Sequence, residues 1–285
     1  MKNKAAQFFK GRKIIIATRH HKEKVIAPLL ESELGVTCIV PDNLDTDSLG
    51  TFTGEVERAD DPLSTARKKC QLAMDMYECD LAIANEGSFG PHPFLVFVPA
   101  DEEIIVLSDR RLNIEIRERE LSNSTKFSAS DILSEDDLWT FAQKAGFPSH
   151  GIILRKAKAE FTGMVKGITN AQELLNHFHY LQENYGQAYA ETDMRALYNP
   201  TRMKVIESAT RKLLAKINSL CPSCNMPGFG ITSVKTGLPC KLCGQPTRSV
   251  LSHLYLCESC KYSKELVYPN QKKFEDPMYC DNCNP

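Results

Sequence analysis

Eight of the eleven cysteines occur in four Cys-x-x-Cys pairs near the end of the chain. In chain order, the first to fourth pairs are Cys221/Cys224, Cys240/Cys243, Cys257/Cys260 and Cys280/Cys283. Each such turn presents two sulfurs to one ion, and structural zinc binds four thiolates in a tetrahedron. Redox Cys-x-x-Cys motifs, by contrast, usually occur singly beside a βαβ unit. We therefore expect these eight cysteines to hold two structural zinc ions.

The spacing of the four pairs does not decide which two share an ion. Sequential, nested and crossed pairing all leave loops of reasonable length. The two inner pairs have the separation of a ribbon-like hairpin, which favours nested pairing. The other three cysteines, Cys38, Cys70 and Cys79, lie in apolar patterns and are expected to be core thiols rather than ligands.

Charged residues are segregated along the chain, although the 35 basic and 36 acidic residues nearly balance. Residues 1–24 hold eight Lys or Arg and one acid, whereas residues 31–61 hold nine acids and one base. This distribution could place a phosphate-attracting edge beside a cation-attracting one. Residues 221–285 hold seven basic and five acidic residues, so the cysteine-rich part lacks the dense basic face that is typical of nucleic-acid binding.

Length and composition indicate a folded protein with one large domain or two ordinary ones. The chain has 285 residues, of which 42% are hydrophobic and 25% are charged. Its longest apolar runs have the length of a strand, far short of the roughly 20 residues that span a bilayer. The first ten residues are basic but lack the apolar stretch of a secretion signal, so we expect a cytoplasmic protein without a membrane contact.

The elements that must position the other candidate residues begin with a βαβ pattern. Residues 13–18 predict a buried strand, a helix follows and ends at Gly35, and residues 36–40 predict a second strand. The turn between the first strand and the helix places Lys22 and Lys24 beside helix N–H groups, which is a common arrangement for binding phosphate. The turn has neither a Gly-rich P-loop nor the dinucleotide fingerprint G-x-G-x-x-G.

A second helix and strand lead to a candidate carboxylate. Asp61 has the features of an N-cap and Pro62 those of a first helical residue, and the predicted helix runs to about Tyr77. The next predicted strand, residues 80–84, ends at Asn-Glu-Gly-Ser, which contains Glu86. Because open α/β sheets bind ligands at the carboxyl ends of their strands, Glu86 is the leading site residue.

The order of these motifs resembles that of the inosine/xanthosine triphosphate pyrophosphatases. The resemblance covers residues 13–110 and rests on a strand ending in Ala-Thr with a basic turn, an acidic loop, a helix reading Asp-Pro-Leu-Ser-Thr-Ala-Arg-Lys-Lys-Cys, and a strand ending in Asn-Glu-Gly-Ser. It implies a mixed-sheet α/β fold that hydrolyses nucleotides with Mg²⁺ or Mn²⁺. The implied triphosphate contacts are Thr18, Lys22 and Lys24, and the implied metal or base carboxylates are Glu57, Asp61 and Glu86.

Nearly the whole chain is also similar to a bacterial family of uncharacterised domains that joins such an α/β half to Cys-x-x-Cys pairs. The expected fold class is accordingly α/β, with a nucleotide-pyrophosphatase-like domain over residues 1–165, a helical segment over 166–220 and a zinc-ribbon-like tail over 221–285. Three strands between residues 92 and 118 are expected to extend the sheet of the first domain.

Two arginines, Arg195 and Arg202, lie in a polar turn before a helix predicted for residues 201–220. Their guanidinium groups could bind phosphate, or they could tie the turn to the domain through salt bridges. The function expected first is a metal-dependent hydrolase of nucleoside triphosphates or a related phosphorylated nucleotide. A non-catalytic nucleotide- or nucleic-acid-binding protein and a zinc-based interaction adaptor are the alternatives, and the oligomeric state stays open.

Overall fold

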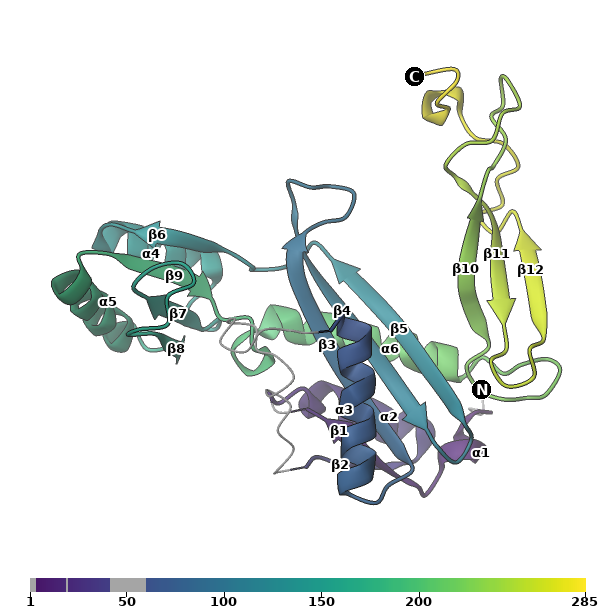
Figure 1. The fold of residues 1–285 in the computed structure, drawn as a ribbon, viewed down its shortest axis with the longest axis horizontal. Coiled ribbons are helices and arrows are strands. Elements are labelled where there is room, and N and C mark those ends of the chain that lie inside the picture. Colours follow the sequence, from purple (N-terminus) through teal and green to yellow (C-terminus); the bar gives the residue numbers. More distant parts are fainter. Residues whose placement is uncertain (1–3, 19, 42–59) are drawn as a thin grey trace. The chain divides into compact units, whose positions relative to one another are not determined.

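The computed structural model describes residues 4–18, 20–41 and 60–285 (Figure 1). The chain divides into two compact units, one made of Phe9–Leu214 and the other of Ala215–Pro285 together with the residues up to Phe8. The boundary falls inside helix α6 (Pro200–Ile217). Within the described ranges, no helix combines the length and the apolar character needed to cross a membrane.

The first sheet of the larger unit is mixed, as the sequence predicts. It has five strands in the order β2-β1-β3-β4-β5. Their bounds are β1 Lys13–Ala17, β2 Thr37–Ile39, β3 Leu81–Pro91, β4 Pro99–Asp109 and β5 Ile114–Ser122. Strand β1 runs parallel to β2 and β3, and β3, β4 and β5 form an antiparallel meander. Strand β3 continues well past the end of β1, so its second half lies beyond the parallel part of the sheet.

Helices α2 (Glu23–Leu34) and α3 (Pro62–Met76) cover opposite faces of this sheet. The chain moves outward from β1 to β2 through α2 and returns to β3 through α3. Because crossovers between parallel strands are right-handed, the reversal of direction puts the two helices on opposite faces. Helix α3 packs small side chains against even-numbered residues of β3 and β4, including Ala66 and Ala73 against Ala84 and Val106. Figure 1 shows α3 on the near side of the sheet and α6 on the far side.

Residues 92–98, for which the sequence predicts a strand, form the turn between β3 and β4 instead. His92 organises this turn, because its Nδ1 accepts the backbone N–H groups of Phe94 and Leu95. Prolines on both sides of the turn cannot donate to a strand ladder. The apolar run that resembled a strand is therefore an exposed tip, in which Phe94 and Phe97 are 86% and 97% exposed.

A second sheet in the same unit corrects the predicted domain boundary at residue 165. Its four antiparallel strands have the order β6-β9-β7-β8, with bounds β6 Ala129–Ile132, β7 Ile152–Arg155, β8 Val165–Ile168 and β9 Ala188–Thr192. Helices α4 (Glu135–Ala145) and α5 (Ala171–Tyr185) form a common core with it. Residue 165 lies inside β8, and the segment predicted to be helical contains β9, which pairs with both β6 and β7. The pairing partners of β9 are distant in sequence, so local patterns did not reveal it.

A fully buried arginine connects α6 to the first sheet. The Nε atom of Arg202 donates to Oε1 of Glu103 in β4 at 2.6 Å, and Nη1 donates to the carbonyl oxygen of Met194 at 2.6 Å. The guanidinium carbon lies 5.0 Å from the ring centre of Phe89 in β3. Gly87 lies directly opposite Glu103 in the β3–β4 register, and its lack of a side chain leaves the space that the ion pair fills.

The smaller unit contains a three-stranded antiparallel sheet in the order β10-β11-β12. The strands are β10 Gly230–Thr236, β11 Val250–Leu256 and β12 Ser263–Val267. Most side chains of β10 and β12 are exposed, so this sheet buries little apolar surface. Its stability must therefore depend on the cysteine-rich loops at its ends.

We predict that Gly87→Ala destabilises the larger unit by about 1–3 kcal/mol. The added methyl carbon would lie 2.5 Å from Nη2 of Arg202 and 2.6 Å from Oε1 of Glu103. Gly90→Ala is the matched control, because a methyl group there meets nothing within 4 Å. Urea unfolding followed by the fluorescence of Trp139, the single tryptophan, measures both variants. Equal effects at the two positions would contradict the close packing at Gly87.

Candidate functional site

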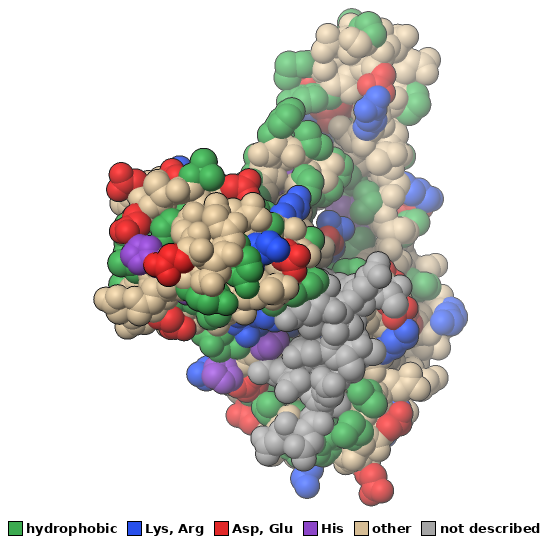
Figure 2. All heavy atoms as spheres, turned by 60° about the vertical axis from the view of Figure 1, so that its left-hand side comes forward, with side chains coloured by type: hydrophobic (Ala, Val, Ile, Leu, Met, Phe, Trp, Pro, Cys, Tyr) green, Lys and Arg blue, Asp and Glu red, His purple; other side chains and the backbone are tan. Residues whose placement is uncertain are grey.

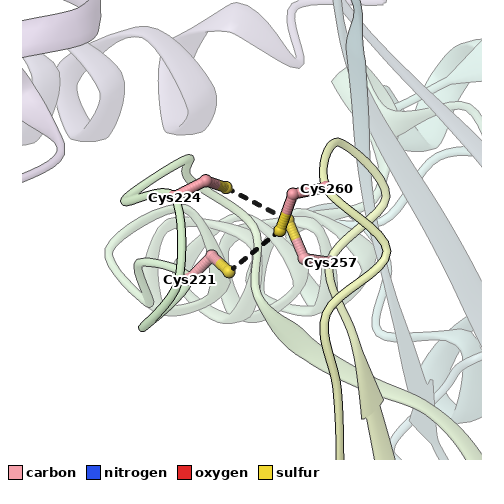
Figure 3. A group of neighbouring side chains, drawn as sticks. All are labelled: Cys221, Cys224, Cys257 and Cys260. Carbon is pink, nitrogen blue, oxygen red and sulfur yellow. Dashed lines mark hydrogen bonds between the residues drawn. The ribbon is translucent and has the colours of Figure 1, made fainter.

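The eight paired cysteines form two quartets whose sulfur atoms lie at the separations that zinc requires. Within each quartet, the ligand atoms all lie within 4.8 Å of one another. In the first quartet the Cys221–Cys260 and Cys224–Cys257 sulfurs are 3.7 and 3.6 Å apart (Figure 3). A tetrahedron with Zn–S bonds of about 2.3 Å has edges of about 3.8 Å. These distances therefore fit a tetrathiolate zinc centre and are far longer than a disulfide bond of about 2.05 Å.

The second quartet has the same geometry at the opposite end of the three-stranded sheet. The Cys240–Cys283 and Cys243–Cys280 sulfurs are 3.9 and 3.6 Å apart. The segment before the fourth pair is fastened to the second pair by backbone hydrogen bonds, since Glu275 accepts from Lys241 and donates to Pro239. Both quartets could hold structural zinc, as the sequence predicts.

The pairing is crossed, so the nested pairing favoured by the sequence is wrong. The first and third Cys-x-x-Cys pairs share one quartet, and the second and fourth share the other. The antiparallel sheet explains this result. The start of β10 pairs with the end of β11, which brings the first pair, just before β10, to the third pair, just after β11. The β10–β11 loop carries the second pair at the other end, and β12 runs back to that end and delivers the fourth.

The three remaining cysteines lie outside both quartets, as expected. The thiol of Cys70 is buried on the face of α3 that packs against the sheet, and burial raises its pKa. Burial likewise raises the pKa of Cys38 to about 12. Cys70 is thus a core thiol, as predicted, whereas Cys38 and Cys79 are only partly buried.

A second candidate site lies at the carboxyl end of β1 in the larger unit. Lys22 is the N-cap residue of α2, is 5% exposed, and donates from Nζ to the carbonyl oxygen of Asn85 at 2.9 Å. Burial, followed by the positive charge of Arg202, lowers the pKa of Lys22 to about 7. Thr18 Oγ1 and Asn85 Oδ1 are buried and have no hydrogen-bond partner among the described residues. This strand end thus combines a buried amine with polar atoms that could accept further bonds.

Lys24, the other predicted phosphate contact in this turn, is exposed. It follows Lys22 by two positions, and residues two apart on a helix do not share a face. The structure therefore separates the two lysines that the sequence grouped together. Of the two lysines, Lys22 is the one that lies with Thr18 and Asn85 at the buried end of β1, and we call this group the polar cluster.

The three predicted carboxylates have different positions. Glu86 is 3% exposed and forms an ion pair with Lys69 of α3. Asp61 is an exposed N-cap, since its Oδ1 accepts from Leu63 and Ser64 and its Oδ2 accepts from the Ser64 hydroxyl. Lys69 lies about two helical turns, or roughly 10 Å, along α3 from that cap. Glu57 lies outside the described residues. In the described part of the chain, the carboxylates form no group of three that fits Mg²⁺ or Mn²⁺.

Two buried carboxyl groups that the sequence analysis missed lie on the other face of the sheet. Side chains alternate along β4, so Asp101 and Glu103 point away from α3, towards Lys22 and Arg202. Both are 0% exposed. Acidic residues at inward positions of an otherwise apolar strand would have been a usable signal. This signal was obscured because three consecutive acidic residues, Asp101-Glu102-Glu103, are typical of a polar turn.

A cavity of about 300 Å³ lies between the end of β3 and the second sheet. Phe89 and Phe127 stack at its wall with ring centres 5.8 Å apart. Arg195 also lines it, forms an ion pair with Asp193, and lies over the ring of Tyr198 at 4.7 Å. Both predicted arginines thus form ion pairs. Arg202 does not line the cavity, but it contacts two residues that do, since Nη1 donates to the carbonyl oxygen of Met194 and the guanidinium lies over the ring of Phe89.

Fold and sites together define a mixed α/β protein with a buried polar cluster in its larger unit and two cysteine quartets in its smaller unit. The chain belongs to the family DUF6671, a domain of unknown function, which matches residues 69–285. That match includes all eight quartet cysteines and the buried Glu86, Asp101, Glu103 and Arg202, whereas β1 and α2 precede it. No match was found among curated proteins.

We predict that Cys221→Ser/Cys257→Ser retains about one zinc ion per chain, because crossed pairing places both substitutions in one quartet. Nested and sequential pairing would each place them in different quartets and remove both ions. Cys221→Ser/Cys240→Ser is the matched control and should lose both. Metal analysis of the purified variants and the parent measures the outcome. Zinc-free Cys221→Ser/Cys257→Ser beside a two-zinc parent would contradict the crossed arrangement.

Proposed function

We propose that the larger unit binds a phosphorylated nucleotide at the carboxyl end of β1 and hydrolyses it. The observation that carries this proposal is the buried Lys22 at the N-terminus of α2. Helix N–H groups and the helix dipole favour an anion at this position. Thr18 adds a buried hydroxyl without a partner among the described residues, which could donate to a phosphate oxygen.

The electrostatics of Lys22 suit a site that fills with an anion. Its lowered pKa means that a large fraction of the amine is neutral near pH 7 when no anion is bound. A phosphate group beside it would favour the ammonium form and be bound by it. Arg202 contributes further positive potential, since its charge is one of the causes that lower the pKa of Lys22.

The cavity lined by Phe89 and Phe127, the aromatic cavity, favours a nucleotide as the ligand over inorganic phosphate. Its volume of about 300 Å³ matches the lower range of small-molecule sites. A planar base could stack on Phe127, and the partly exposed guanidinium of Arg195, which Asp193 holds in place, offers N–H donors to a base or a sugar. Arg202 contacts two lining residues of this cavity, Met194 and Phe89, and its charge also acts on Lys22.

For hydrolysis, Glu86 is the proposed carboxylate that acts on the attacking water. It lies at the middle of β3, two positions beyond the last residue that pairs with β1; its side chain faces α3, and its charge acts on Lys22 past the end of β1. A requirement for Mg²⁺ or Mn²⁺ is a separate question, which the same assay answers when it is run with and without the metal.

The second candidate function is that of an interaction adaptor, in which the cysteine-rich smaller unit binds a partner. Large apolar side chains surround the second quartet, including Leu242 at 73% and Tyr279 at 59% exposed. With zinc bound, each tetrathiolate centre carries a formal charge of about 2−, which outweighs the small basic excess of residues 221–285. The side of the smaller unit that is visible in Figure 2 shows isolated acidic and basic side chains rather than a continuous basic face. These features favour a protein partner over a nucleic acid.

We predict that Lys22→Met weakens the binding of nucleoside triphosphates at pH 6.5 by at least about tenfold, because it removes a charge-assisted bond in a buried site. Lys24→Met is the matched control, because Lys24 is exposed in the same turn. It should change affinity less than about twofold at 0.15 M salt, where surface charges are screened. Isothermal titration with a panel of triphosphates measures both. Equal affinities in the parent and Lys22→Met would reject this anion site.

We predict that Glu86→Gln lowers the rate of triphosphate hydrolysis by at least about 100-fold, the lower bound for losing a general base. This variant also leaves Lys69 buried without its counter-ion, so Glu86→Gln/Lys69→Met, which removes both charges, is the control for folding. If Glu86 acts on water, both variants are inactive. Recovery of activity in the double variant would make Glu86 only the partner of Lys69. Release of pyrophosphate and of phosphate is measured separately.

A further inference from the structure

Asp101 and Glu103 present an unusual number of buried carboxyl oxygens without partners. Both oxygens of Asp101 and Oε2 of Glu103 have no hydrogen-bond partner among the described residues. The fourth oxygen, Oε1 of Glu103, accepts from Arg202 at 2.6 Å. An unpartnered carboxylate in a protein interior is strongly unfavourable, so such a group takes up a proton or holds a cation.

The charged groups around this pair leave Asp101 without a cation of its own. Arg202 of α6 forms an ion pair with Glu103. Glu120 of β5 lies opposite Glu103 in the strand register and pairs with Lys212 of α6. Lys22 of α2 is the remaining cation that acts on Asp101, and its own pKa is lowered to about 7. Burial and the charge of Glu103 dominate, and they raise the pKa of Asp101 to about 8.

We propose that Asp101 is a carboxylic acid whose hydroxyl group donates a hydrogen bond to Oε2 of Glu103. As two carboxylates, these neighbours have only acceptors to offer each other, whereas one proton between them supplies the missing donor. The pair then carries a single negative charge, which Arg202 balances. The proton satisfies two of the three unpartnered oxygens.

Asp101 is then a positioning residue that acts through Glu103 on Arg202. It also keeps a second negative charge away from Lys22. This effect on Lys22 rests on the anion site proposed above, whereas the shared proton does not. An anion should bind while Asp101 is neutral, and ionisation of Asp101 should repel it.

The shared proton makes the stability of the larger unit depend on pH in a defined direction. An aspartic acid in an unfolded chain gives up its proton near pH 4, and folded Asp101 does so near pH 8. The folded state therefore holds an additional proton between these values, and the free energy of unfolding falls as pH rises through this interval. An amide side chain at this position is neutral throughout, so this contribution disappears in Asp101→Asn.

The test combines infrared spectroscopy with unfolding of the full chain. At pH 7, the parent should show the carbonyl stretch of a protonated carboxyl group, and Asp101→Asn should lack it. Asp131→Asn, at an exposed position, is the matched control and should keep the band. In urea unfolding followed by Trp139 fluorescence, raising the pH from 5 to 8 should destabilise the parent relative to Asp101→Asn. Glu103→Gln should be unstable at both pH values, because it removes the carboxylate from Arg202.

Three results would overturn the proposal. The first is the absence of the protonated-carboxyl band at neutral pH, and the second is the same pH dependence of stability in the parent and Asp101→Asn. The third is one Mn²⁺ ion per chain, in addition to zinc, whose binding is lost in Asp101→Asn but not in Asp131→Asn. That result would assign the pair to a cation.

Inorganic pyrophosphate separates this proposal from the proposed function. At pH 7, Asp101→Asn should bind it as the parent does, and at pH 9 it should bind more tightly than the parent. A parent that binds no pyrophosphate at any pH would reject the anion site. The infrared and unfolding measurements would still decide the protonation of Asp101.

Discussion

The larger unit depends on the burial of one charged side chain, that of Arg202. A guanidinium in the interior is tolerated only when its charge and its N–H groups are matched, because removing one partner of a buried pair costs about 3–5 kcal/mol. Glu103 supplies the charge and Met194 a carbonyl oxygen. Gly87 leaves the space for both side chains. These contacts join α6 to β3 and β4, and they also fix the turn before α6 that lines the aromatic cavity.

The same ion pair sets the charge balance of the polar cluster at the carboxyl end of β1. Burial and then the charge of Arg202 lower the pKa of Lys22, and burial and then the charge of Glu103 raise that of Asp101. On the opposite face of the sheet, Lys69 and Glu86 neutralise each other. Buried charges of both signs therefore lie on both faces of the sheet at this end.

The two units are stabilised by different physical means. The larger unit buries apolar side chains in two cores, one beneath α3 and one between the second sheet and helices α4 and α5. The smaller unit exposes most of β10 and β12 and has a small apolar cluster around Phe229 beside the first quartet. Metal binding at its quartets would supply the folding free energy that so small a core lacks.

Local spacing and residue type were enough to predict several features of this protein. Four Cys-x-x-Cys pairs identified all eight members of the quartets, and the cap formed by Asp61 and Pro62 set the start of α3. The parallel β1-α2-β2 unit also followed from hydrophobic periodicity. Each of these features is specified within a few residues, so no distant contact was needed to recognise it.

Tertiary structure decided which of these residues meet. The crossed pairing of the cysteines follows from the directions of β10, β11 and β12, and loop lengths do not encode it. The burial of Asp101 and Glu103 depends on which face of the first sheet α6 covers. Strand β9 is defined by its pairing with strands that are distant in sequence. Whether Lys22 or Lys24 enters the polar cluster is likewise set by the docking of α2 on the sheet. In each case the outcome is determined by contacts between segments that are far apart in the chain. Local sequence patterns do not predict such contacts.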